Sequence, residues 1–280
     1  QTFRTFPIER VTADIDDIYY KHNTRAIFIV DDNLVLDPER VIDLCDAIIA
    51  KNYGGLNLHV QADCISIAGN EAMVRKMSLA GVKTVFLGIE NVVKKNLMAS
   101  GKGDIVDLSK KAVRICHQFG ILVIAGLIFG FPDDDENDIV DNYRFLKSLD
   151  ADIPYCQILT PYPKTPVRQQ LLERGMVTNL HDYKLYNGLR ANIKTRHLDT
   201  QQLQYLVWLH RQKMFGWWEP SRLMRIKGGL WVTFWTHLLR PFLRSTVGRQ
   251  QAQKSWKELY ERDVKYLDGL NQFKNLARNY

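Results

Sequence analysis

The stretch Ile121-Leu-Val-Ile-Ala-Gly-Leu-Ile-Phe129, followed directly by Gly130-Phe-Pro-Asp133, decides the fold class of this sequence. The uninterrupted apolar run predicts a strand that is buried on both faces of a parallel sheet. Four further strand patterns lie on either side of it, at 25–30, 56–60, 83–90 and 155–159. Helical patterns separate them, at 38–51, 70–80, 104–119 and 134–149. This alternation predicts right-handed βα units, arranged either as a barrel or as an open sheet.

Composition sets outer limits on the kind of protein. The chain has 280 residues, of which 46% are hydrophobic and 25% charged. This suits one large domain, or one domain with an appendage, and excludes disordered, collagen-like and coiled-coil proteins. No apolar run reaches the roughly 18–20 residues that a membrane span requires. The four cysteines form no Cys-x2-Cys pair, and we expect buried, reduced thiols in a cytoplasmic protein.

Positive charge is concentrated in the last hundred residues. The formal net charge is +7, and residues 220–257 contain no acidic side chain. We therefore expect a separate helical, basic and aromatic-rich region at 176–280, in which the stretch from residue 181 is helical with clear patterns at 199–218 and 250–275. Its segment 221–244 interleaves arginines with tryptophans, which suits a helix docked on the main domain, a lid over a hydrophobic substrate, or peripheral membrane contact. The sequence has no RNA-binding module, which argues against nucleic acid as a partner.

Polar residues follow the predicted strands at the point where each one ends. Asp31-Asp32-Asn33, Asp63, Glu90, Gly130-Phe-Pro-Asp133 and Thr160 occupy these positions. In parallel α/β folds the ligand sites lie beyond the carboxyl ends of the strands. Each aspartate alone is equally well explained as a helix cap. Five such strand ends together predict a polar ligand site at one edge of an apolar sheet.

Four of these stretches resemble the radical S-adenosylmethionine (radical SAM) enzymes, in the branch that often carries an upstream cobalamin-binding domain. The matching segments are 27–33, 80–90, 126–133 and 161–166, in the order and spacing of that family. The resemblance implies an α/β fold, a partial (β/α)6 TIM-like barrel that lacks its first strand. This incomplete barrel spans residues 1–175, and the mainly α-helical region 176–280 follows it.

The same resemblance implies cofactors and partners. S-adenosylmethionine would bind a 4Fe-4S cluster, and its reductive cleavage would give a 5′-deoxyadenosyl radical. An electron donor would be required, and the substrate would be a small molecule or lipid-like. With an upstream cobalamin domain, methyl transfer to a hydrophobic substrate is the reaction we expect. The substrate itself is not readable, because one scaffold supports several reactions.

The resemblance implies cofactor-binding roles for residues at the strand ends, namely Asp32, Asn33, Glu90, Ile128, Gly130, Ile158 and Leu159, and for Lys102 in a loop. Glu90 would accept hydrogen bonds from the ribose or the methionine part of the cofactor. Ile128 and Gly130 would pack the adenine, and the backbone of Ile158 and Leu159 would meet its edge. Lys102 would meet the methionine carboxylate, or is simply a solvated loop lysine.

One departure from the family is large. Its first strand ends in Cys-x3-Cys-x2-Cys, which holds the cluster irons, and Cys45, Cys64, Cys116 and Cys156 cannot reproduce that spacing. We therefore expect a chain that begins downstream of the first strand, binds no cluster by itself and is inactive alone. Two alternatives stay open at this point. One is a divalent-metal hydrolase or lyase using Asp31, Asp32, Asp63 and Glu90; the other is a non-catalytic barrel without a cluster.

Overall fold

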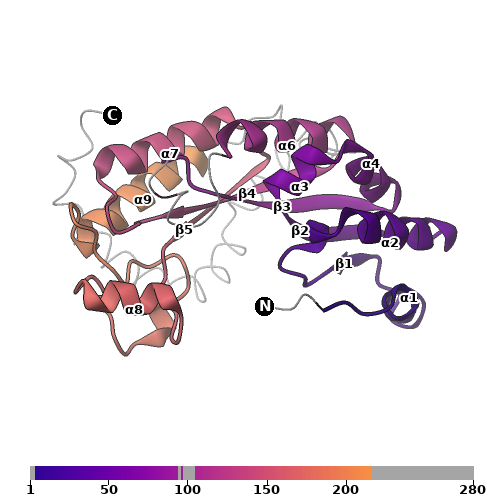
Figure 1. Cartoon of the computed structure of the whole chain (residues 1–280), viewed down its shortest axis with the longest axis horizontal. Coiled ribbons are helices and arrows are strands. Elements are labelled where there is room, and N and C mark those ends of the chain that lie inside the picture. Colours follow the sequence, from indigo (N-terminus) through magenta and orange to yellow (C-terminus); the bar gives the residue numbers. More distant parts are fainter. Residues whose placement is uncertain (1–3, 94–95, 97–104, 216–280) are drawn as a thin grey trace, which may run out of the picture. The chain divides into compact units, whose positions relative to one another are not determined.

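The computed structural model describes residues 4–93, 96 and 105–215, with side chains described as far as residue 210 (Figure 1). Lys102 and the segment 221–244 lie outside the described residues. The chain divides into two compact units. Unit 1 comprises residues 1–127 and 144–155, and unit 2 comprises residues 128–143 and 156–280.

A five-stranded sheet forms the scaffold, with its strands in chain order: β1 (Ala26–Phe28), β2 (Asn57–Asp63), β3 (Val82–Glu90), β4 (Leu122–Phe129) and β5 (Ile153–Ile158). The pairings β1–β2, β2–β3 and β3–β4 are all parallel. Consecutive parallel neighbours are the topology of a βα barrel rather than of a doubly wound sheet. The five-stranded partial barrel predicted from the sequence is thereby confirmed.

Helices connect the strands. They are α1 (Ile8–Asp16, continued by a π-helical turn Asp17–Lys21), α2 (Pro38–Ala50), α3 (Cys64–Gly69), α4 (Glu71–Leu79), α6 (Val106–Gln118), α7 (Glu136–Ser148), α8 (Pro166–Glu173) and α9 (Thr200–Phe215). Short 3-10 turns occur at Leu34–Leu36 and Tyr183–Leu185. The side chain of Asp37 caps α2 and that of Thr165 caps α8, each directly before a proline. Proline at the first helical position lacks only an N–H that would have had no helical partner.

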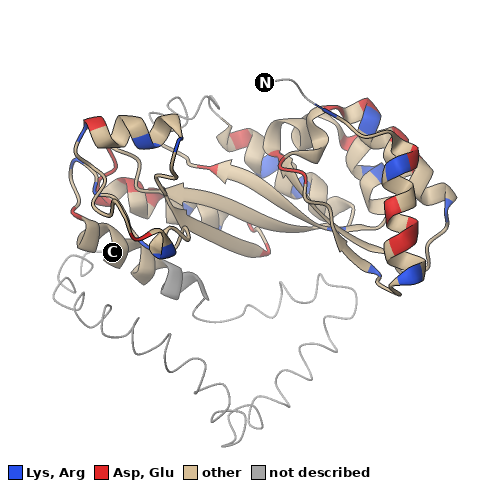
Figure 2. Cartoon of the chain, turned by 90° about the horizontal axis from the view of Figure 1, so that it is seen from below, with Lys and Arg blue, Asp and Glu red and all other residues tan. Residues whose placement is uncertain are grey.

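The two faces of the sheet differ in burial. On β2, Leu58, Val60 and Ala62 are buried, and the residues between them are half-buried. Figure 1 shows α3, α4 and α6 on one side of β2 and β3, which accounts for the buried face. Charged residues lie mainly on helices and loops, and the strands are nearly free of them (Figure 2).

The prediction that the strand at 121–129 is buried on both faces is wrong. On β4, Val123 and Ala125 are fully buried, whereas Leu122 and Ile124 are half-buried. The physical reason is that a barrel strand turns one face toward the helices and the other toward the barrel interior, so its two faces have different neighbours. A long apolar run therefore predicts a strand, but it does not determine how deeply each face of that strand is buried.

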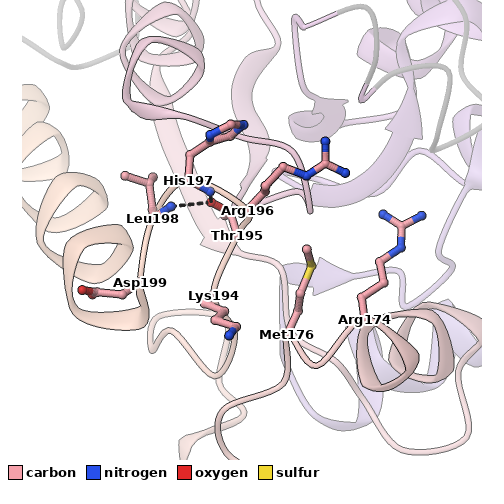
Figure 3. Close-up of a pocket in the computed structure, with 8 residues that line it drawn as sticks. All are labelled: Arg174, Met176, Lys194, Thr195, Arg196, His197, Leu198 and Asp199. Carbon is pink, nitrogen blue, oxygen red and sulfur yellow. Dashed lines mark hydrogen bonds between the residues drawn. The ribbon is translucent and has the colours of Figure 1, made fainter.

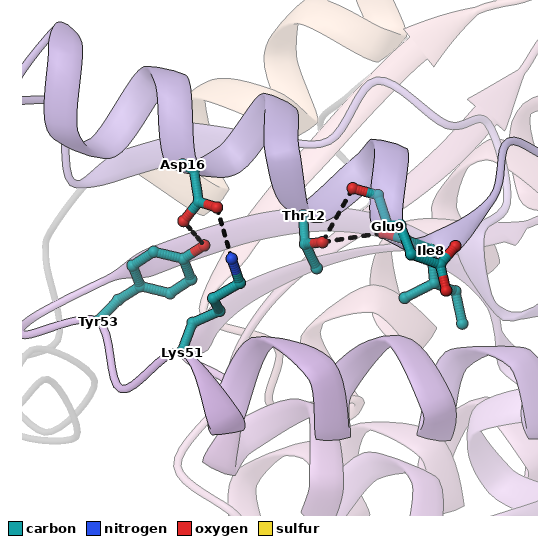
Figure 4. Close-up of polar contacts among 6 residues, drawn as sticks. All are labelled: Ile8, Glu9, Thr12, Asp16, Lys51 and Tyr53. Carbon is teal, nitrogen blue, oxygen red and sulfur yellow. Dashed lines mark hydrogen bonds and ion pairs between the residues drawn. The ribbon is translucent and has the colours of Figure 1, made fainter.

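Hydrogen bonds from residues just after α2 hold helix α1 in place (Figure 4). Asp16 on α1 accepts hydrogen bonds from Lys51 Nζ at 2.6 Å and from Tyr53 Oη at 2.7 Å. The bond from Lys51, followed by that from Tyr53, lowers the pKa of Asp16. Burial and the bond to Asp16 raise the pKa of Tyr53. Thr12 Oγ1 donates to the carbonyls of Ile8 and Glu9, within the helix.

The stretch from His181 to the start of α9 is not the helix that the sequence predicted. Only the turn Tyr183–Leu185 is helical before Thr200. The amide of Asn192, 1% exposed, donates to the carbonyls of Leu185 and Arg190. Side-chain amides that bond to the backbone compete with helix formation. The helical pattern from residue 199 is confirmed as α9 as far as Phe215.

Candidate cofactor site

The carboxyl end of β3 carries an unusual backbone turn at Glu90. Glu90 has φ 67°, and the N–H of Asn91 donates to the carbonyl of Ile89 at 2.9 Å. This hydrogen bond closes a three-residue γ-turn, and the pairing with β4 is irregular between Gly88 and Glu90. A non-glycine residue in the left-handed region is uncommon and costs roughly 1–2 kcal/mol. Strain of this kind is concentrated at functional sites.

A buried amide holds this turn in place. Asn91 is 1% exposed, and its Oδ1 accepts hydrogen bonds from Val93 N at 2.8 Å and Asn96 Nδ2 at 3.2 Å. The Glu90 side chain itself is half-buried. The local structure therefore fixes the backbone of Glu90 at the end of the strand, where the residue is partly exposed. Asn91 was not predicted as a site residue, although its place directly after a predicted strand is a signal for one.

The ends of β1 and β2 are joined by a reciprocal pair of hydrogen bonds. Asn33 Nδ2 donates to Asp63 Oδ2 at 3.0 Å, and Asp63 N donates to Asn33 Oδ1 at 3.2 Å. Asn33 N also donates to Asp31 Oδ1 at 3.0 Å. The Asn33 amide therefore has a structural role that does not depend on a cofactor. Asp32, the other residue predicted in this loop, is exposed.

Asp63 also caps α3. Its carboxylate accepts Ser66 N and Ser66 Oγ, both at 2.7 Å. Burial acts to raise the pKa of Asp63, but the bonds from Ser66 and Asn33 outweigh it, and the pKa is lowered. These hydrogen bonds favour the ionised form of the Asp63 carboxylate, and both of its oxygen atoms already accept hydrogen bonds within the protein. Among the described residues, no group of three His, Cys, Asp or Glu side chains is placed to hold a metal ion, so the divalent-metal alternative receives no support from the structure.

In unit 2, the loop after β4 is organised by Asp134. This residue is 0% exposed, and its Oδ2 accepts the N–H groups of Gly130 at 3.0 Å and Phe131 at 2.9 Å. Gly130 has φ 86°, and a Cβ on it would lie 2.9 Å from Leu203 Cδ2. Glycine is therefore favoured here mainly by the backbone conformation, and a side chain would also displace the end of Leu203. Asp134 was not predicted as a site residue, because it lies in a run of three aspartates.

The other predicted cofactor residues lie around the same strand ends of unit 2. Ile158 is 1% exposed, whereas Ile128 and Leu159 are half-buried. The backbone N–H of Ile158 donates to Gly188 O at 2.7 Å and that of Leu159 to Phe129 O at 2.8 Å. These backbone donors already have acceptors within the protein. The adenine-binding role of these residues stays a prediction.

The four cysteines are dispersed and buried. Cys45 lies on α2, Cys64 begins α3, Cys116 lies on α6 and Cys156 lies on β5. Burial, then the nearby Asp46 carboxylate, raises the pKa of Cys45 to about 12. Burial, with a smaller contribution from Cys64, raises that of Cys116 to about 12. Low-pKa, exposed thiolates react and bind metals, whereas all four of these thiols are buried and the pKa values of Cys45 and Cys116 are raised.

We expect Cys45 and Cys116 to resist alkylation in the folded chain. At pH 8 a thiol with a pKa near 12 is thiolate only about one part in ten thousand. Iodoacetamide should therefore label both residues at least about 100-fold more slowly in buffer than in urea. Peptide mass spectrometry after timed quenching measures this ratio. Equal labelling rates in the two solvents would contradict the structure.

The fold and the strand-end loops define the chain as a partial βα barrel, the class that places its ligand sites at the carboxyl ends of the strands. A family model described as the radical SAM superfamily matches residues 2–146. This match covers more than half of the chain, which therefore belongs to the radical SAM superfamily.

Two curated relatives are named as methyltransferases. An uncharacterised methyltransferase of Pyrococcus horikoshii is 27% identical over 205 residues, which are 73% of this chain and 44% of that protein. Bacteriochlorophyllide d C-8(2)-methyltransferase of Chlorobaculum tepidum is 28% identical over 157 residues, which are 55% of this chain and 35% of the relative. The chain thus spans less than half the length of these curated relatives.

A solved structure shows the same fold. The cobalamin-dependent S-adenosylmethionine radical enzyme OxsB, with aqua-cobalamin bound, superposes with a TM-score of 0.58 at 17% identity. The match covers 94% of this chain and 42% of OxsB. At this level of identity the likeness concerns the fold alone.

No helix in the described parts of the chain combines the length and apolar character that crossing a membrane requires.

Proposed function

We propose that this chain is the barrel portion of a radical SAM enzyme and that the carboxyl ends of its strands hold S-adenosylmethionine. The observation that carries the proposal is the γ-turn at Glu90, where a glutamate is held in the left-handed region at the end of β3. Backbone strain at a strand end of a parallel α/β fold is typical of a ligand site. Membership of the radical SAM superfamily identifies the ligand class.

The residues of unit 1 fit this cofactor. S-adenosylmethionine carries an ammonium group and ribose hydroxyls, which donate hydrogen bonds, and a half-buried carboxylate such as Glu90 accepts them strongly. The turn is fixed by Asn91, which is buried. The backbone of Glu90 is therefore fixed before the cofactor arrives, which lowers the entropic cost of binding.

The residues of this chain do not fit a 4Fe-4S cluster. Its four cysteines lie on four different elements and include no Cys-x3-Cys-x2-Cys sequence. We propose that the cluster ligands come from residues outside these 280, and that the chain alone is inactive. None of the roles that we propose for residues of this chain involves the cluster. We also propose that the complete enzyme requires an electron donor.

Methyl transfer is the reaction class that we propose. Two relatives are named methyltransferases, and OxsB is named as cobalamin-dependent. We accordingly propose cobalamin as a further cofactor, held outside this chain. The lipid-like substrate and the membrane contact predicted for 221–244 stay predictions, as does a cytoplasmic location.

A hydrophobic substrate is supported by the less buried face of the sheet in unit 1. Phe86 and Tyr155 meet there edge to face, with ring centroids 5.5 Å apart. A Cβ on Gly126 would lie 2.5 Å from Phe86 Cζ, so the ring lies directly over this glycine. Phe28, on the same face, is 52% exposed. Accessible aromatic side chains of this kind suit an apolar ligand.

The test uses the protein that carries this chain together with the cluster-binding residues. After anaerobic cluster reconstitution, we expect S-adenosylmethionine and a one-electron reductant to yield 5′-deoxyadenosine or, for a methyl transfer, S-adenosylhomocysteine. Liquid chromatography with mass spectrometry measures both products, and omission of the reductant is the control. A cluster-loaded protein that releases neither product and does not bind S-adenosylmethionine would overturn the proposal.

A further inference from the structure

Unit 2 contains a pocket that lies outside the residues matched by the family model (Figure 3). Its volume is about 380 Å³. The loop between α8 and α9 forms most of it, together with the carboxyl end of α8. The lining residues are Arg174, Met176, Lys194, Thr195, Arg196, His197, Leu198 and Asp199.

The lining is predominantly cationic. Arg174, Lys194 and Arg196 are positively charged, and Asp199 supplies the single carboxylate of the lining. That carboxylate is used elsewhere, because its Oδ1 accepts the N–H groups of Gln201 and Gln202, both at 2.8 Å, at the start of α9. Figure 3 shows Asp199 directed toward α9, on the opposite side of the pocket from Arg174.

The loop that carries these cations is rigidly attached to its surroundings. Thr195 is 4% exposed, and its Oγ1 donates to the carbonyl of Asp134 at 2.7 Å and accepts Leu198 N at 2.9 Å. The N–H of Arg196 donates to Pro132 O at 2.8 Å, and that of Lys194 to Met176 O at 2.9 Å. The basic side chains therefore extend from a preformed backbone, which lowers the entropic cost of binding a ligand.

These same bonds place the pocket beside the loop that follows β4. Arg196 also forms an ion pair with Asp133 of that loop at 3.0 Å, with side chains 66% and 42% exposed. The Arg196 side chain stays largely exposed in this ion pair, so its charge also contributes to the positive potential at the pocket.

We propose that this pocket binds the carboxylate or phosphate group of a small ligand. Arginine guanidinium groups match the planar or tetrahedral oxygens of such groups with paired N–H donors. Met176, 8% exposed, and Leu198, 7% exposed, provide an apolar lining for the carbons next to that group. The inference does not depend on the proposed function, because no radical chemistry enters it.

The test follows the ring signal of His197 by proton NMR in the full 280-residue chain, with inorganic phosphate and succinate as separate probes. Total ionic strength is held constant with sodium chloride. The His197 signal is assigned by its loss in His197→Gln. We expect a saturable shift, and Arg174→Gln should weaken binding about tenfold, as the loss of one charge-assisted hydrogen bond does.

The matched control is Lys184→Gln, which removes an exposed cation of the same unit that does not line the pocket. It should leave the affinity unchanged, and circular dichroism verifies that both variants are folded. A response to phosphate alone, to succinate alone or to both supports the proposal and identifies the source of the oxyanion. A shift that sodium chloride reproduces, or one that Arg174→Gln leaves unaltered in a folded chain, would overturn it.

Discussion

Replacing Asp134 with alanine is expected to destabilise the folded chain by about 3 kcal/mol. The carboxylate is fully buried and accepts the N–H groups of Gly130 and Phe131. Alanine would leave both amides buried without this acceptor, and each unsatisfied donor costs about 1–3 kcal/mol. Asp134→Asn retains one oxygen acceptor and should lose less, about 1–2 kcal/mol.

Urea unfolding gives the free energy, and hydrogen exchange at the Gly130 and Phe131 amides shows whether the loss is local. The matched control is Asp43→Ala, an exposed aspartate on α2, which should change stability by no more than about 0.5 kcal/mol. If Asp134→Ala unfolded at the same urea concentration as the unmodified chain, with unchanged exchange at both amides, the described loop would be incorrect.

Most of the scaffold was predictable because its signals are local. Pro38 marks a helix start, and each apolar run became a strand within a few residues of its expected bounds. Helix α8 was not predicted, although Pro166 begins it. The short α3 was not predicted, because its cap, Asp63, also ends β2. The single-faced burial of β4 could not be predicted either, since it depends on which neighbours cover each face.

The candidate site was predictable only in part. The position of Glu90 in a family motif predicted it as a site residue. Its left-handed backbone conformation could not be predicted, because glutamate rarely adopts that conformation. The bonds between Asn33 and Asp63 join residues that are 30 positions apart, and they depend on the pairing of β1 with β2. Asp134, rather than Asp133 or Asp135, accepts the hydrogen bond from the Gly130 N–H. The loop geometry determines this choice, because the three residues are of the same type.

Replacing Glu90 with glutamine is expected to weaken S-adenosylmethionine binding by about 10–100-fold. A charge-assisted hydrogen bond contributes about 1.5–3 kcal/mol, and each 1.4 kcal/mol is a factor of ten in affinity. Glutamine keeps the size of the side chain and removes its charge. Glu90→Ala should weaken binding at least as much. Neither change adds backbone strain, since glutamine and alanine meet the same cost as glutamate at φ 67°.

The most direct test of the account is therefore the dissociation constant of S-adenosylmethionine in the cluster-loaded protein, measured by anaerobic equilibrium dialysis. Glu39→Gln, which changes an exposed glutamate on α2, is the matched control. We predict that Glu90→Gln and Glu90→Ala raise the dissociation constant at least about tenfold while Glu39→Gln leaves it unchanged. Equal dissociation constants for all four folded proteins would contradict the placement of the cofactor at the end of β3.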